Sequence, residues 1–231
     1  MTSLFLGAYW QSRKESIAVC SRHSRDFFCK ISQLGARLSK WYELGESRKD
    51  ALRRKARLDD LSYWKGLLSQ GRHRTDLGNK VMHDLGFSFG LWNGGPDTAA
   101  CGVHIHCGDY AGTLTNCLAM DIRIADPSAI LPEVLRITAD VWQPDWAGVM
   151  SKAAMDRRNY NASRPFVDWM TYISDRWLPD PPKLAAPSVV EQVPGGTLIV
   201  VQETPPDVDN PEDQRSVRAA KRAIEKLLSI E

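Results

Sequence analysis

Three segments in the middle of the chain alternate apolar and polar side chains with a period of two residues, and this pattern constrains the fold most. The apolar positions are Phe87, Phe89 and Leu91; Val103, Ile105 and Cys107; and Leu118, Met120, Ile122 and Ile124. A period of two is typical of a β-strand that buries one face. Because short loops join the segments, they predict an antiparallel sheet whose second face carries the intervening residues.

Helical and strand patterns alternate over the rest of the chain. The expected helices cover residues 12–39, 59–70, 132–142 and 211–227, and the expected strands cover residues 3–10, 146–151, 167–174, 188–193 and 197–202. The first helix is predicted to begin at a capping box formed by Ser12 and Glu15. These patterns predict an α+β fold with two closely packed lobes, residues 1–144 and 145–231, each an antiparallel sheet with flanking helices.

The charge is unevenly distributed although the net charge is only +2. Residues 1–80 hold 17 Lys and Arg against 8 Asp and Glu, whereas residues 81–150 hold 2 against 8. A second window, residues 184–214, contains acids and no Lys or Arg. Such asymmetry can steer a charged partner to one part of the surface.

The sequence favours a cytoplasmic protein. No apolar run approaches the roughly 20 residues that cross a bilayer, and the first residues lack the order of a signal peptide. The five cysteines stand at positions 20, 29, 101, 107 and 117. An odd number of scattered cysteines is typical of free thiols in a reducing compartment, so we expect no membrane association.

Residues that could carry catalysis are sparse. The best metal candidates are Cys101, His104, His106 and Cys107, but strand alternation places only the two histidines on one face. No nucleotide-binding or hydrolase motif is present. The sequence therefore favours a protein without cofactor, metal or catalytic residues, and leaves a metalloenzyme that uses His104 and His106 as an alternative.

A basic stretch, Arg48 to Arg57, keeps a second alternative open. It holds six Lys and Arg residues, as a nucleic-acid-binding surface would. It lacks interleaved aromatic residues, so the pattern favours a solvated helical face or a connector.

Several blocks of the sequence resemble the immunity protein 52 family. They are Gly7, Tyr9 and Trp10 followed by Arg13, Glu15 and Ser16; Trp41 and Tyr42; residues 47–52; residues 85–94; residues 168–172; and residues 196–201. The resemblance implies a small cytoplasmic protein, encoded beside a polymorphic toxin, that neutralises the toxin by binding it. It implies as partner a type VI secretion effector with a nuclease (DNase) domain, and no active site.

Strand alternation then predicts the binding face. The predicted partner-binding residues emerge from the polar face of the sheet or from its adjoining turns: Trp92, Asn93, Asp97, His104, His106, Asp109, Tyr110 and Asp121. A helix from the first 80 residues either covers this face or leaves it open.

Acidic residues would suit the basic groove of a DNase, so we expect the stretch Arg48–Arg57 to lie outside the interface. The acidic window Glu203–Asp213 is the second candidate for the toxin-binding surface. Occlusion and distortion of the toxin, and the oligomeric state, stay open.

Overall fold

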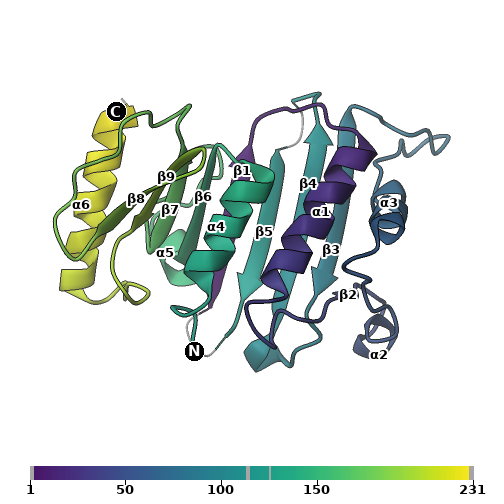
Figure 1. Ribbon diagram of the computed structural model, residues 1–231, viewed down its shortest axis with the longest axis horizontal. Helices are drawn as coiled ribbons and strands as arrows, with labels where there is room; N and C mark the ends of the chain where they lie inside the picture. Colours follow the sequence, from purple (N-terminus) through teal and green to yellow (C-terminus); the bar gives the residue numbers. More distant parts are fainter. Residues whose placement is uncertain (1–2, 113–114, 125, 229–231) are drawn as a thin grey trace. The chain divides into compact units, whose positions relative to one another are not determined.

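The computed structural model describes residues 3–112, 115–124 and 126–228 (Figure 1). The chain divides into two compact units, here called the central unit, Trp10–Ala125, and the terminal unit, Met1–Tyr9 with Asp126–Glu231. The expected division at residue 144 assigns the first strand and the helix that follows residue 130 to the N-terminal lobe. Their contacts place both in the terminal unit, because that strand and that helix pack on the strand that begins at Trp146.

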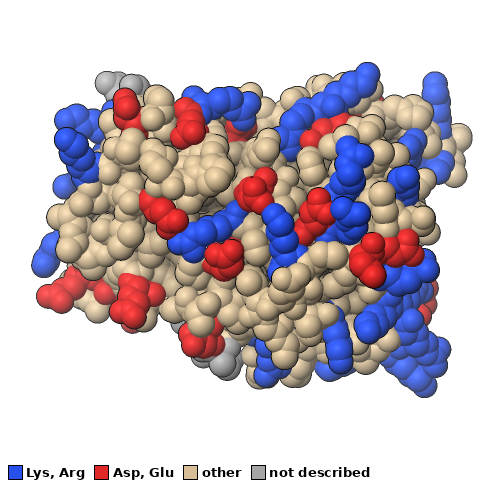
Figure 2. Space-filling view, in the orientation of Figure 1, with Lys and Arg blue, Asp and Glu red and all other residues tan. Residues whose placement is uncertain are grey.

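The two units differ in charge. The central unit contains 18 Lys and Arg against 12 Asp and Glu, a net charge of +6. The terminal unit contains 12 against 16, a net charge of −4. Figure 2 shows basic side chains gathered at the lower right of the view, where helix α2 of the central unit lies in Figure 1.

The central unit is an antiparallel sheet with its two longer helices packed against it. Its strands lie in the order β2 (Tyr42–Glu43), β3 (Leu85–Trp92), β4 (Cys101–Asp109) and β5 (Asn116–Ile122). Its helices are α1 (Ile17–Ile31), the single turn α2 (Arg48–Ala51), α3 (Leu61–Gln70) and the short 3-10 helix η1 (Asp97–Ala99).

Aromatic side chains form the core of the central unit beneath α1. Helix α1 packs on β4 and α3. Its Phe28 ring lies 5.1 Å from the rings of both Trp41 and Trp64, and none of the three side chains is exposed. Burial of three large aromatic side chains stabilises the unit by several kcal/mol, on the order of 2 kcal/mol for each.

The terminal unit repeats the plan with other elements. Its antiparallel strands lie in the order β1 (Leu4–Trp10), β6 (Trp146–Ser151), β7 (Met170–Ser174), β9 (Gly196–Val200) and β8 (Val189–Val193). Its helices are α4 (Leu131–Trp142), α5 (Lys152–Arg157) and α6 (Pro211–Leu228). Gly195, with φ of +82°, makes the tight turn between β8 and β9.

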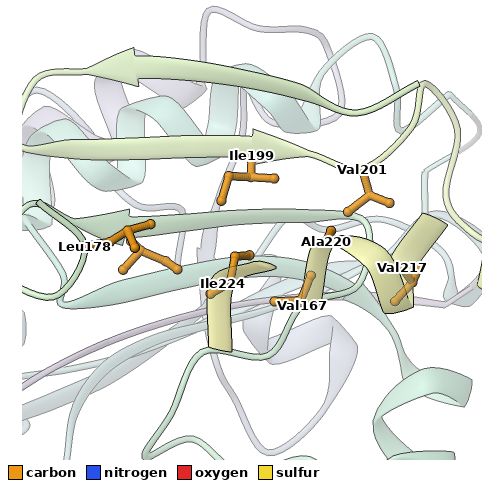
Figure 3. Close-up of a cluster of buried hydrophobic side chains, with 8 residues drawn as sticks. Val167, Leu178, Ile199, Val201, Val217, Ala220 and Ile224 are labelled. Atoms are coloured by element: carbon orange, nitrogen blue, oxygen red, sulfur yellow. The ribbon is translucent and has the colours of Figure 1, made fainter. Parts of the chain in front are cut away.

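Helix α6 is held by a cluster of aliphatic side chains (Figure 3). The cluster joins α6 to strands β7 and β9 and to three connecting segments, through Val167, Ile173, Leu178, Ile199, Val201, Val217, Ala220 and Ile224. The helix begins where the sequence predicts, because the Asn210 side chain accepts a hydrogen bond of 2.9 Å from the Glu212 amide.

A buried carboxylate fixes the segment between β6 and β7. Asp168 is fully buried, accepts a hydrogen bond of 2.9 Å from the Ser151 amide and forms an ion pair with Arg158. Burial raises the pKa of Asp168, while the Ser151 amide and the Arg158 guanidinium act in the opposite direction.

The α+β class predicted from the sequence is confirmed, and most predicted elements occur, but the first helix is shorter than predicted. It begins at the N-cap Ser16 rather than at Ser12, because the Arg13 amide donates to the Asp109 carbonyl at 2.8 Å and keeps the chain extended. Glu15 pairs with the Arg13 guanidinium instead of forming a capping box. Helix α1 ends at Ile31, and a turn with φ of +154° at Gly35 follows.

We predict that Asp168→Ala lowers the free energy of unfolding by about 3 kcal/mol, because it leaves the Arg158 charge without its buried partner. Urea unfolding measures the change. Asp209→Ala is the matched control, since Asp209 pairs with Arg157 at the surface and should cost less than about 1 kcal/mol. Equal losses in the two variants would contradict the prediction.

Candidate protein-binding surface

The alternation in β3, β4 and β5 separates a core face from an outer face. All ten predicted core positions are at most 9% exposed, from Phe87 on β3 to Ile124 just beyond β5. Residues that pair directly across antiparallel strands point to the same face, so the register defines the other side. We call this side the outer face: Ser88, Gly90, Trp92, Gly102, His104, His106, Cys117, Ala119 and Asp121.

One row of paired residues crosses the outer face at the end near Trp92. Tyr42 of β2 pairs with Trp92, Trp92 with Gly102, and Gly102 with Asp121. On the far side of β2, Tyr42 also pairs with Lys55. A Cβ atom placed on Gly102 would meet nothing within 4 Å, so the face is open between Trp92 and Asp121.

Trp92 is half-buried between two neighbours. The Arg48 guanidinium of α2 lies 5.4 Å from the Trp92 ring centroid, and the Tyr42 ring lies 6.3 Å away. Cation–π contact and ring packing hold the indole in place. The basic stretch that begins at Arg48 therefore adjoins the predicted binding face.

Two exposed leucines extend the surface around Trp92. Leu44 is 62% exposed, and its Cδ1 lies 3.0 Å from the position of a Cβ on Gly90. Leu52 is 42% exposed and lies beside Gly94, as does the Tyr42 ring. We call Tyr42, Leu44, Leu52 and Trp92 the apolar patch. Only Trp92 was predicted from the sequence as a binding residue, because β2 has only two residues and gives no periodic signal.

Histidines occupy the middle of the outer face. His104 is exposed, with its Nε2 3.1 Å from the Ser88 Oγ, whereas His106 is buried, with its ring 5.3 Å from that of His73. Burial, and then His73, lower the pKa of His106 to about 4. The same causes lower the pKa of His104. Both imidazoles are therefore neutral at pH 7 and give the face polar groups without charge.

The sequence-based metal candidates do not converge. Cys101 and Cys107 are buried on the core face, opposite to His104 and His106. Cys117 pairs with His106, but burial raises the pKa of its thiol and disfavours the thiolate that binds metal. Over the described part of the chain, no group of three or more His, Cys, Asp or Glu could hold a metal ion.

Asn93 is buried and organises the connection between β3 and β4. Its Oδ1 accepts hydrogen bonds from the amides of Gly95 and Cys101, at 3.0 and 2.9 Å. Its Nδ2 donates to the carbonyls of Ala99 and Arg37, at 3.2 and 3.1 Å. These four hydrogen bonds fix the conformation of the turn beside Trp92. The Asn93 side chain therefore lies inside the unit rather than on its surface.

Asp109 and Tyr110 lie at the opposite end of β4. Asp109 is fully buried, and its Oδ1 accepts from the Gly112 amide at 3.1 Å. Tyr110 is 39% exposed, with the Lys14 ammonium 4.9 Å from its ring centroid. Eight residues separate Gly102 from Tyr110, about 26 Å along a strand, so the predicted residues do not form one compact cluster.

The remaining four predicted residues lie on the outer face or in the β3–β4 connection. Trp92 is half-buried, and Asp97, His104 and Asp121 are exposed. The Asp97 carbonyl accepts from the Arg123 guanidinium at 3.1 Å, which fixes η1 against the end of β5.

The acidic window Glu203–Asp213 uses several of its carboxylates locally. Asp213 accepts from the Asp207 amide at 2.8 Å, and Asp207 accepts from the Asp209 amide at 2.9 Å. These contacts shape the turn before α6, where negative charge also favours the start of the helix.

The structure defines the class as an α+β protein that exposes an apolar patch beside one face of its sheet. The chain belongs to the immunity protein 52 family, which it matches over residues 2–229. Its fold is similar to that of the solved structure of "Pseudomonas aeruginosa T6SS protein PA0821", with a TM-score of 0.56 and 11% identity, over 98% of this chain and 77% of that chain. A comparison with curated proteins finds no match. In the described residues, no helix has the length and apolar character needed to span a membrane.

We predict that Asn93→Ala lowers the free energy of unfolding by about 2 kcal/mol, because it leaves the Cys101 amide and the Ala99 carbonyl without their buried partner. Urea unfolding tests this. Gln192→Ala, which removes an amide side chain from an exposed position in β8, is the control and should change the free energy much less. An Asn93→Ala protein with unchanged stability would refute the structural role.

We predict that stability falls as the pH is lowered from 6.5 toward 4, because unfolding lets His106 take up a proton that the folded protein resists. Between pH 7 and pH 4.5, the free energy of unfolding should fall by about 2 kcal/mol less in His106→Gln than in the wild-type protein. Urea unfolding at both pH values measures it, with the exposed His83→Gln as control. An unchanged pH dependence in the His106 variant would contradict the assignment.

Proposed function

We propose that this chain is the immunity protein of a type VI secretion effector with nuclease (DNase) activity, and that it neutralises this toxin by binding it in the cytoplasm. The family match over residues 2–229 is the observation that carries the proposal. The similar fold of a T6SS protein from Pseudomonas aeruginosa supports the same assignment.

The proposed contact surface is the apolar patch with His104 and Asp121 of the outer face and Asp97 of the β3–β4 connection. Trp92 and the exposed leucines offer apolar area that a partner can bury, and tryptophan is common among residues that dominate binding energy. Inhibition then comes from binding that occludes or distorts the toxin's active site, without a catalytic step in this chain. Asn93 supports the turn beside Trp92 from inside.

Titration of the toxin with this protein tests the function. The toxin encoded beside this gene is purified and its DNA cleavage is measured at increasing ratios of immunity protein. We predict that cleavage ends at about one immunity chain per toxin, or at another fixed ratio if the complex has a different stoichiometry. A noncognate nuclease is the control and should keep its activity.

Two results would refute this proposal. Loss of toxin activity at a ratio far below one to one would indicate turnover, and therefore an enzyme. DNA binding by this protein alone, with no effect on the toxin, would favour the nucleic-acid-binding alternative, whose affinity should fall steeply with salt.

A further inference from the structure

The apolar patch has a basic margin made by α2 and the segment that follows it. The Arg48 guanidinium lies over the Trp92 ring, and Lys55 pairs with Tyr42. The exposed Arg53 follows Leu52 directly, and the exposed Lys49 lies three residues before it. We call Arg48, Lys49, Arg53 and Lys55 the basic margin. Figure 2 shows the concentration of basic side chains at this corner of the central unit.

Two acids in or near this segment, Asp50 of α2 and Glu43 of β2, interact with groups outside the basic margin. Asp50 forms an ion pair of 2.8 Å with Arg54. Glu43 lies beside Tyr63, where burial and then this carboxylate raise the pKa of the phenol. The positive charge of the margin is therefore only partly compensated within its own segment, in a unit whose net charge is +6.

The contact between Arg48 and Trp92 joins the charge to the apolar patch. A partner that buries Trp92 must come within a few ångströms of the Arg48 guanidinium, which lies 5.4 Å from the ring. A positive surface approaching this point would meet like charge, whereas a carboxylate could form charge-assisted hydrogen bonds with the guanidinium.

We propose that the apolar patch and the basic margin together bind an acidic surface of the toxin that carries an exposed apolar side chain, away from its basic DNA groove. This inference rests on the proposed function and specifies the chemistry of the partner. It reverses the expectation from the sequence that Arg48–Arg57 lies outside the interface, because the structure places Arg48 on Trp92.

The charge of the margin also argues against insertion of this surface into the nuclease groove. A nuclease groove that binds phosphates is positively charged, so the basic margin is poorly suited to enter it. The immunity protein then acts from a neighbouring surface, by covering the entrance of the groove or by changing its shape.

Charge reversal tests the role of the margin. The affinity for the toxin, inactivated by substitution in its active site, is measured for Lys49→Glu and Arg53→Glu at several salt concentrations. We predict at least a tenfold loss of affinity for each variant, mainly through slower association, and a weaker salt dependence. Arg22→Glu and Lys65→Glu make the same charge change at exposed positions on α1 and α3 and should alter affinity less than threefold.

The apolar patch is tested by Leu44→Ser and Trp92→Ala, each checked by thermal unfolding. Leu44 is 62% exposed, so its replacement should leave the fold intact and still weaken binding at least fivefold. Val189→Ala, at a 57% exposed position in β8, is the control. Unchanged affinity in Leu44→Ser and in both charge reversals would overturn the inference.

Asp97→Lys tests the sign of the partner's charge. It adds positive charge in η1, within the β3–β4 connection that begins beside Trp92. Affinity should rise if the toxin surface is acidic. A tenfold loss for Asp97→Lys, with no loss for Lys49→Glu, would assign a basic toxin surface and overturn the inference.

Further outcomes separate this inference from the proposed function. If the wild-type chain neutralises the toxin and the margin variants do so equally well, the function stands and the inference fails. If the wild-type chain does not bind the toxin, both fail. A margin that binds a DNA duplex, or a second copy of this chain, while toxin affinity is unaffected by its reversal, also overturns the inference.

Discussion

The two-residue alternation of β3, β4 and β5 is the constraint on which the central unit depends. A shift of register by one residue would expose the apolar side chains that α1 covers and bury the histidines of the outer face. Because the register is fixed by this large difference in burial, each outer residue has a defined neighbour. The row from Lys55 through Tyr42 and Trp92 to Gly102 follows from that register. The arrangement of the proposed contact surface therefore depends on the register that core packing fixes.

Much of this could be predicted from the sequence, because the relevant signals are local. Alternation predicts the buried positions of β3 to β5, and Asn210 before Pro211 predicts the start of α6. The candidate surface was predictable only in part. Trp92 is on the predicted face, but its neighbours Tyr42 and Arg48 come from a two-residue strand and a single helical turn. Such short elements are stabilised by pairing with distant residues, which no local pattern records.

The burial of two polar turn residues was likewise not predictable from local sequence patterns. Asn93 and Asp109 have the pattern of exposed loop residues, since both occur beside glycine and at the end of an alternating segment. In the structure, both side chains turn inward and satisfy backbone groups that the turns would otherwise leave unpaired. The cost of an unpaired buried amide, about 1–3 kcal/mol, is a tertiary effect that depends on how tightly the turn closes.

On the outer face, His104 has only small neighbours on the adjacent strands, since it pairs with Gly90 and Ala119. Leu44 lies beside Gly90, and Leu52 follows in the same exposed segment. Neither leucine belongs to the core, so their replacement leaves the packing beneath α1 unchanged. In the proposed interface, these two partner-contacting leucines are thus separate from the residues that form the core. A lineage could exchange one partner for another by substitutions in a short exposed segment, while the sheet that supports it stays the same.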